Sequence, residues 1–269
     1  MGPLVTFAAA VLGLHAGAAL AQSADVEVDL ELVLAVDVSR SMDYDELKLQ
    51  RDGYVEAFRH PEIIQAIQSG SLGRIAVTYF EWAGPGYQTQ IAPWTVISNA
   101  AEADSFAATL AAGPISRETG TSISSGLFYA AGRFEGNGFS SMRQTIDISG
   151  DGANNAGQRV DMTRDWVVSR GITVNGLPIL LKPDYRFSPY GIPNLDIYYE
   201  DCVIGGPGAF MIAVTDPANF SAAIRRKLVL EIAGLPPRVF HAAEVLKQPR
   251  IDCLIGEKTR RNMIFDMDR

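Results

Sequence analysis

The chain has 269 residues, 47% of them hydrophobic, and a formal net charge of −8. This length and composition suit one large domain, or one domain with a tail, and such a chain can bury a full core without metals or many disulfides. The basic clusters Arg225–Lys227 and Arg260–Arg261 are too short for a nucleic-acid-binding stripe, and the acidic balance disfavours an anionic membrane surface.

The first residues predict a signal peptide, residues 1–21. Leu4 to Leu20 is an apolar run that ends in Ala19-Leu20-Ala21, which has the small residues of a cleavage site. The run is short for a membrane span and contains His15. No Lys or Arg precedes it, so an uncleaved N-terminal anchor remains the alternative. No later stretch is long and apolar enough to cross a membrane, and we expect a periplasmic or secreted protein.

Hydrophobic periodicity predicts an α/β domain over residues 26–235. The first strand alternates from Glu27 and then runs apolar from Leu32 to Val36, as in a strand buried on both faces of a parallel sheet. Further strands are expected at 74–82, 88–96, 143–149, 172–179 and 209–214, and helices at 43–58, 61–69, 101–112, 122–134, 160–170, 195–203 and 218–232.

Alternating strands and helices indicate parallel βαβ units. The expected fold is therefore a doubly wound, open, mostly parallel six-stranded sheet with helices on both faces, of the Rossmann type. Strand 88–96 should be antiparallel to its neighbour, because the turn Gly84–Gly86 between them is short. Residues 236–269 read as a polar C-terminal tail with little periodicity.

Two cysteines, Cys202 and Cys253, lie far apart in the sequence. In an oxidising compartment an even pair suggests a disulfide, which would tie the tail to the domain and stabilise it by roughly 4 kcal/mol. Two buried free thiols are the alternative.

Three loops with oxygen-bearing side chains flank the expected strands and helices. Residues 37–41 (DVSRS) follow the first strand, residues 119–122 (TGTS) precede a helix, and residues 149–152 (SGDG) follow the fourth strand. Ligands of open α/β sheets bind beyond the carboxyl ends of the strands. We therefore expect these loops to meet.

The loops offer only oxygen ligands, which suit a hard cation such as Mg²⁺. Alternation places Asp37, Ser39 and Ser41 on one side of their loop. Thr121 begins a helix, and Asp151 lies between two glycines that let the backbone come close. With mostly neutral ligands the ion keeps a net positive charge and would attract a carboxylate.

The order D-x-S-x-S, G-T and S-G-D-G resembles the metal-ion-dependent adhesion site (MIDAS) of von Willebrand factor A domains, and the order of elements resembles that family from about Val26 to Gly234. The resemblance implies that Ser39, Ser41 and Thr121 bind Mg²⁺ (or Mn²⁺ or Ca²⁺) directly, and that Asp37 and Asp151 act mainly through water. The stretches IDISGDGANN and YEDCVIGGPGAF also resemble an uncharacterised group of exported bacterial proteins with this domain.

The expected function is a secreted, non-catalytic, cation-dependent protein-binding module whose partner offers a carboxylate to the metal. A structural domain whose metal only stabilises the fold is the first alternative. An envelope hydrolase is the second, with His60 or His241 as base, but the G-x-S-x-G nucleophile motif is absent. No phosphate-binding loop is present, so no nucleotide is expected.

Overall fold

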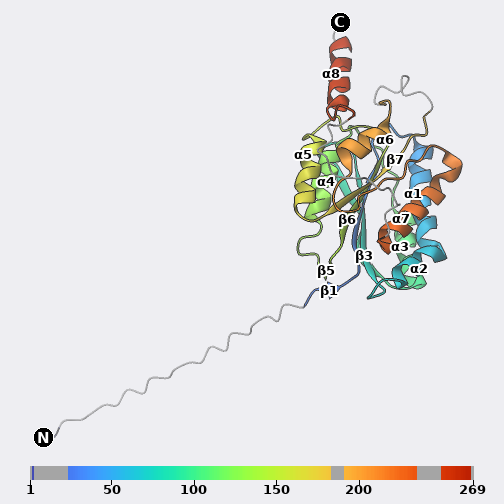
Figure 1. Ribbon diagram of the computed structural model, residues 1–269, viewed down its shortest axis with the longest axis vertical. Helices are drawn as coiled ribbons and strands as arrows, with labels where there is room; N and C mark the ends of the chain where they lie inside the picture. Colours follow the sequence, from blue (N-terminus) through green and yellow to red (C-terminus); the bar gives the residue numbers. More distant parts are fainter. Residues whose placement is uncertain (1, 3–23, 183–190, 235–249, 268–269) are drawn as a thin grey trace.

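The computed structural model describes residue 2 and residues 24–182, 191–234 and 250–267 (Figure 1). Five strands form the central sheet in the order β4-β3-β2-β6-β7. Their bounds are Glu31–Asp37 (β2), Ile75–Trp82 (β3), Gln88–Ile97 (β4), Gln144–Gly150 (β6) and Thr173–Pro178 (β7). Only β4 is antiparallel to its neighbour, as its short turn predicts. A separate parallel pair joins β1 (Val26–Glu27) to β5 (Phe139–Ser140).

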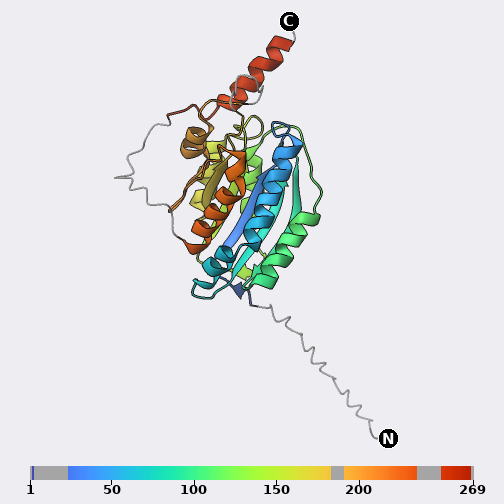
Figure 2. The same cartoon turned by 90° about the vertical axis from the view of Figure 1, so that its right-hand side faces the viewer.

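Helices cover both faces of the sheet. One face carries α1 (Tyr44–Arg59), α2 (Pro61–Gln68), α3 (Ala100–Ala112) and α7 (Phe220–Ala233), the last preceded by a 3₁₀ turn, Pro217–Asn219 (Figure 2). The other face carries α4 (Ile123–Gly132), α5 (Val160–Ser169) and α6 (Leu195–Tyr198), which continues into a π-helix, η2 (Tyr199–Val203). Within the described residues, no helix is both long and apolar enough to cross a membrane.

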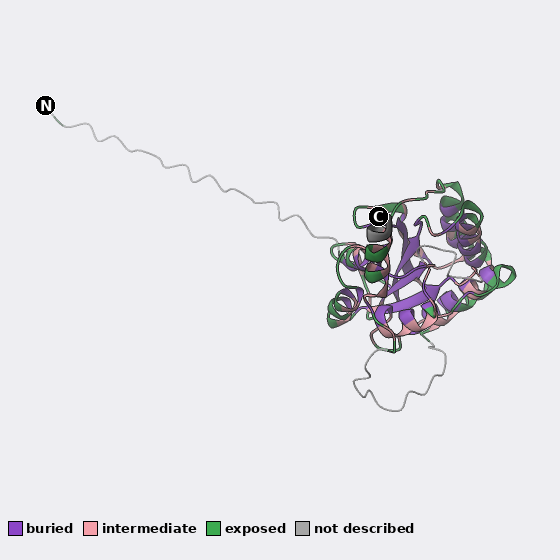
Figure 3. Ribbon diagram, turned by 90° about the horizontal axis from the view of Figure 1, so that it is seen from above, coloured by how far each residue is buried: buried purple, intermediate pink, exposed green. Residues whose placement is uncertain are grey.

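The central strand β2 is buried along its whole length. Leu32, Leu34 and Val36 pack into the core under α1 and α7, whereas Val33 and Ala35 pack into the core under α4 and α5. The continuous apolar run therefore fills both cores, and Figure 3 shows the buried sheet between exposed helix surfaces.

The expected sixth strand is absent, and the prediction of six strands is wrong. Residues 209–214 run beside β7 but make only isolated parallel bridges, from Met211 to Gly176 and from Val214 to Ile179. Gly176 exchanges two backbone hydrogen bonds with this segment, and the carbonyl of Pro178 accepts a third from Val214. Pro178 has no N–H to donate in return, so the ladder is interrupted.

Residues 250–267 contain regular structure that their sequence pattern does not indicate. Residues Ile255–Met267 form helix α8. Cys202 of η2 and Cys253 form a disulfide with Cα atoms 5.6 Å apart, closing a loop with a sequence separation of 51. The tail is thus fastened beside α6 and η2. The expected signal peptide and His241 lie outside the described residues.

A buried group of charges lies between β6, β7 and α7. The Lys227 ammonium lies 2.5 Å from an oxygen of Asp147 and also pairs with Glu231, and all three side chains are at most 1% exposed. Asn175 donates a hydrogen bond of 2.9 Å to Glu231. Burial, followed by the charge of Asp147, raises the pKa of Glu231 to about 7. One ammonium therefore holds two carboxylates in the core.

Replacing Lys227 by Met should lower the free energy of unfolding by about 3–5 kcal/mol, because two buried carboxylates lose their cation. Denaturant unfolding at neutral pH would measure the change. The triple variant Lys227→Met, Asp147→Asn, Glu231→Gln should recover most of the loss. A free energy of unfolding for Lys227→Met within about 1 kcal/mol of the wild-type value would contradict this account of the core.

Candidate metal centre

The three loops meet at the carboxyl edge of the sheet. Because β2 and β6 are adjacent and parallel, the residues that follow Asp37 and Gly150 leave the sheet side by side. The loop of residues 119–122 joins them through the residue before it. The backbone N–H of Glu118 donates a hydrogen bond of 2.7 Å to the carbonyl of Val38, in a bridge between Glu118 and Ser39. The strand order thus brings together segments more than 100 residues apart.

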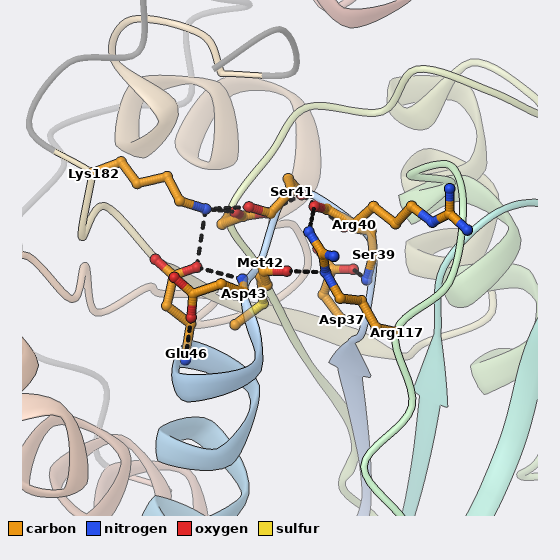
Figure 4. Close-up of polar contacts among 10 residues, drawn as sticks. Asp37, Ser39, Arg40, Ser41, Met42, Asp43, Glu46, Arg117 and Lys182 are labelled. Carbon is orange, nitrogen blue, oxygen red and sulfur yellow. Dashed lines mark hydrogen bonds and ion pairs between the residues drawn. The ribbon is translucent and has the colours of Figure 1, made fainter. Parts of the chain in front are cut away.

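Four of the five predicted ligands form one hydrogen-bonded group. The backbone N–H of Ser39 donates to Asp37 Oδ1 at 2.7 Å. The hydroxyls of Ser39 and Ser41 are 2.8 Å apart, and the Ser41 hydroxyl donates to Asp151 Oδ1. Since the Ser41 proton goes to Asp151, Ser39 is the donor between the two hydroxyls. Figure 4 shows the first loop of this group.

Thr121 lies beside this group but is not hydrogen-bonded to it within the described residues. Its backbone N–H donates to Asn155 Oδ1 at 3.1 Å, and its carbonyl accepts from the Asn155 N–H at 2.8 Å. Thr121 and Ser41 both line a cavity of about 60 Å³. The side chain and backbone of Asn155 therefore hold the position of Thr121.

The carboxylates of the site lack full compensation. Asp37 is completely buried, and its Oδ2 has no hydrogen-bond partner among the described residues. Burial, followed by the charge of Asp151, raises the pKa of Asp37 to about 8. Burial also raises the pKa of Asp151, although Lys182 and Ser41 oppose the shift. A bound cation would offset the electrostatic cost of both groups.

The donor set matches a hard cation better than a soft one. Within the described ranges, no group of three or more His, Cys, Asp or Glu side chains is placed to hold a metal. The predicted site instead combines two carboxylates with three hydroxyls, the oxygen chemistry that suits Mg²⁺. Asp37, Ser39, Ser41, Thr121 and Asp151 thus fit such an ion in ligand type.

Gly150 allows β6 to approach Asp37. A Cβ at this position would lie 2.8 Å from Asp37 Oδ2 and 2.9 Å from the hydroxyl oxygen of Tyr199. Both distances are too short for a carbon contact, so with any other residue either the strand end or the side chains of Asp37 and Tyr199 would have to shift. The glycine before Asp151 therefore serves close packing at the site, as its place in the sequence indicates.

The first loop is held by side chains that the sequence pattern does not reveal. Arg117 donates to the carbonyls of Arg40 and Met42, each at 2.7 Å (Figure 4). Gln50 of α1 donates to the Asp37 carbonyl at 3.0 Å and accepts from Ser149 at the same distance. These contacts to backbone carbonyls leave no signature in the spacing of residues.

Lys182 was also missed, and it contacts the predicted site directly. Its ammonium lies 3.1 Å from Asp151 Oδ2 and 2.9 Å from a Glu46 oxygen, and it donates to the Ser41 carbonyl (Figure 4). The only hint in the sequence is a lysine a few residues beyond the end of a parallel strand. Its positive charge partly neutralises Asp151, whereas Asp37 has no ion-pair partner among the described residues.

Within the described residues, no histidine lies near the three loops. His60, the one histidine in the described part of the chain, accepts a hydrogen bond from the Glu62 N–H at 3.3 Å and caps α2. Helix α2 lies near the opposite edge of the sheet from the three loops (Figure 1).

Several solved structures share this fold. Proximal thread matrix protein 1 from the mussel byssus has a TM-score of 0.55 at 15% identity, covering 78% of this chain and 49% of that one. The pilus adhesin SpaC of Lactobacillus rhamnosus GG has a TM-score of 0.55 at 14% identity, covering 79% and 32%. A structure of the mussel protein with a zinc-occupied MIDAS motif has a TM-score of 0.51 at 13% identity, covering 78% and 49%.

The chain spans about half the length of the mussel protein and about a third of the adhesin. At these identities the likeness shows the fold alone, which is von Willebrand factor A-like. No curated protein is detectably similar in sequence. Residues 27–236 match the family described as "Protein of unknown function (DUF1194)", and the chain belongs to that family.

Proposed function

We propose that this protein is a divalent-cation-dependent protein-binding module. Asp37, Ser39, Ser41, Thr121 and Asp151 would hold the ion, with Mg²⁺ as the first choice and Mn²⁺ or Ca²⁺ as substitutes. The main support is the hydrogen-bonded group of Ser39, Ser41 and Asp151, which lies beside a fully buried Asp37 oxygen that has no hydrogen-bond partner in the described part of the chain. Such an arrangement is costly without a positive charge among the oxygens.

The hydroxyls of Ser39, Ser41 and Thr121 would bind the ion directly, and the two carboxylates would act mainly through water. A bound Mg²⁺ supplies a positive coordination position at which a water can be exchanged for another oxygen ligand. Neutral hydroxyl ligands leave most of its charge uncompensated. We propose that a carboxylate from a protein partner takes this position, without chemical conversion.

Access to the site favours partner binding over a purely structural ion. Asp37, Ser39 and Thr121 are buried, but Ser41 is partly exposed and lines the 60 Å³ cavity. An ion bound there would keep one side toward that cavity. A structural ion has no need of such an opening.

We also propose export to the periplasm or the exterior, with residues 1–21 as signal peptide, 26–235 as the binding domain and 236–269 as a tail. The Cys202–Cys253 disulfide supports this location, because disulfides persist in oxidising compartments. The pilus and byssus proteins that share the fold agree with an extracellular setting.

Asp37→Asn and Ser41→Ala should each weaken Mn²⁺ or Mg²⁺ binding at least about tenfold, because each removes an oxygen that holds the ion or its water. Isothermal calorimetry would measure the affinities. Asp45→Asn, an exposed carboxylate in the first turn of α1, is the matched control and should bind like wild type.

The same titrations should show affinity rising with pH up to about 8. Below the raised pKa of Asp37 the ion must displace a proton, whereas above it the carboxylate is already charged. Unchanged cation affinity in both site variants would refute the metal centre.

Lys182→Met should strengthen cation binding about three- to tenfold, since the ammonium beside Asp151 repels a second positive charge. The effect should shrink in high salt. Lys48→Met is the control, because Lys48 is an exposed lysine that pairs with Asp52. Weaker cation binding in Lys182→Met would show that the lysine organises the site instead of competing for it.

The partner should be recoverable through its dependence on the ion. Wild-type protein used as bait should capture the partner from the native envelope in Mg²⁺ but not in chelator. The Ser41→Ala variant used as bait should not capture it even in Mg²⁺. Mass spectrometry would compare the three eluates. A partner retained by Ser41→Ala in chelator would contradict a cation-bridged contact.

A further inference from the structure

Helix α8 is fitted against the loop that follows β6. Gly256 lies so close to the carbonyl of Asn154 that a Cβ would overlap its oxygen. The Glu257 carboxylate accepts a hydrogen bond of 2.7 Å from Asn154 Nδ2, and Arg260 Nη1 donates to the Asn155 carbonyl at 3.3 Å. Residues 256, 257 and 260 share one side of the helix, so its first two turns form an interface.

Two further connections fasten the helix. The disulfide from Cys202 to Cys253 lies just before it. Arg250 pairs with Glu200 and lies 3.1 Å from an Asp201 oxygen. From this base α8 extends away from the carboxyl edge of the sheet (Figure 1), and the view from above places it within the outline of the domain (Figure 3).

Arg260 thereby reaches the cavity of the proposed metal centre. The 60 Å³ cavity is lined by Ser41 and Thr121, by Asn155, and by two arginines, Arg40 and Arg260. Neither arginine forms an ion pair with any residue in the described ranges, and each is at least partly exposed. Two guanidinium groups without an ion-pair partner among the described residues therefore border the opening, beside two predicted direct ligands.

Guanidinium groups recognise carboxylates through paired hydrogen bonds. A ligand whose carboxylate reaches the ion would bring any neighbouring negative charge close to Arg260. The protein's overall charge of −8 would repel such a ligand, so local positive charge is needed for specific capture.

Building on the proposed function, we propose that Arg260 is a ligand-binding residue of this site and that the ligand is an acidic peptide segment with two adjacent carboxylates. One carboxylate completes the coordination of the cation, and the second pairs with Arg260. The disulfide-anchored helix α8 is then part of the binding site, although it lies outside the central sheet and its covering helices.

The test compares two peptides on the Mn²⁺-loaded protein, acetyl-Gly-Glu-Glu-Gly-amide and acetyl-Gly-Glu-Gln-Gly-amide. Wild type should bind the first about tenfold more tightly, and Arg260→Ala should lose this preference. Arg261→Ala is the control, because it removes the same charge from an exposed neighbouring position and should keep the preference. Titration followed by water-proton relaxation of Mn²⁺ would report the binding.

Arg260 also contacts Asn155, which holds Thr121, so an indirect effect must be separated from pairing with the ligand. Pairing predicts that Mn²⁺ binds Arg260→Ala at least as tightly as wild type, because a positive charge beside the ion is removed, whereas loosening of Thr121 predicts weaker Mn²⁺ binding. A second variant, Gly256→Val, should displace α8 because its side chain would overlap the Asn154 carbonyl. It retains Arg260 but should also abolish the preference for the peptide with two glutamates.

Peptide binding that depends on Mn²⁺ but shows the same preference in Arg260→Ala as in wild type would overturn this inference and leave the proposed function standing. Peptide binding that does not depend on Mn²⁺ would contradict both this inference and the proposed function. Loss of Mn²⁺ affinity together with the preference would assign Arg260 a structural role and also overturn the inference.

Discussion

The parallel pairing of β2 with β6 is the constraint on which the candidate site depends. It aligns Val36 with Ser149, so the chain leaves both strands at the same level. Asp37 and Asp151 then lie close enough for the charge of one to raise the pKa of the other. A change in register by one residue would turn one of these carboxylates to the other face of the sheet and dismantle the group.

The burial of Asp37 at the end of β2 determines the chemistry of the site. A carboxylate in contact with water needs no protein partner, but Asp37 is buried, and one of its oxygens has no hydrogen-bond partner among the residues that the structure describes. The surrounding groups stabilise the loop backbone through Gln50 and Arg117 more than they neutralise this charge. Hydrogen bonds thus hold the loop, while one oxygen of Asp37 keeps no partner in the described part of the chain, as expected if these residues are to receive a cation.

The sequence could predict whatever follows from local pattern and strand order. The apolar run of β2 predicted a strand covered on both faces, and the Asp and Ser residues at the strand ends predicted that the three loops meet at one edge of the sheet. The prediction of a sixth strand was wrong because Pro178 has no backbone N–H to donate to the hydrogen-bond ladder between β7 and residues 209–214. Helix α8, Arg117 and Lys182 could not be predicted, because their positions depend on contacts between residues remote in sequence and on no periodic pattern.

Positive charge is divided between the two sides of the site. Lys182 lies against the carboxylates Asp151 and Glu46, where it would compete with an ion in the proposed site. Arg260 borders the cavity, where its charge would add to the attraction that such an ion exerts on an acidic ligand. Because Arg260 belongs to a helix fastened by a disulfide, reduction of that disulfide would then weaken recognition of the ligand more than binding of the ion.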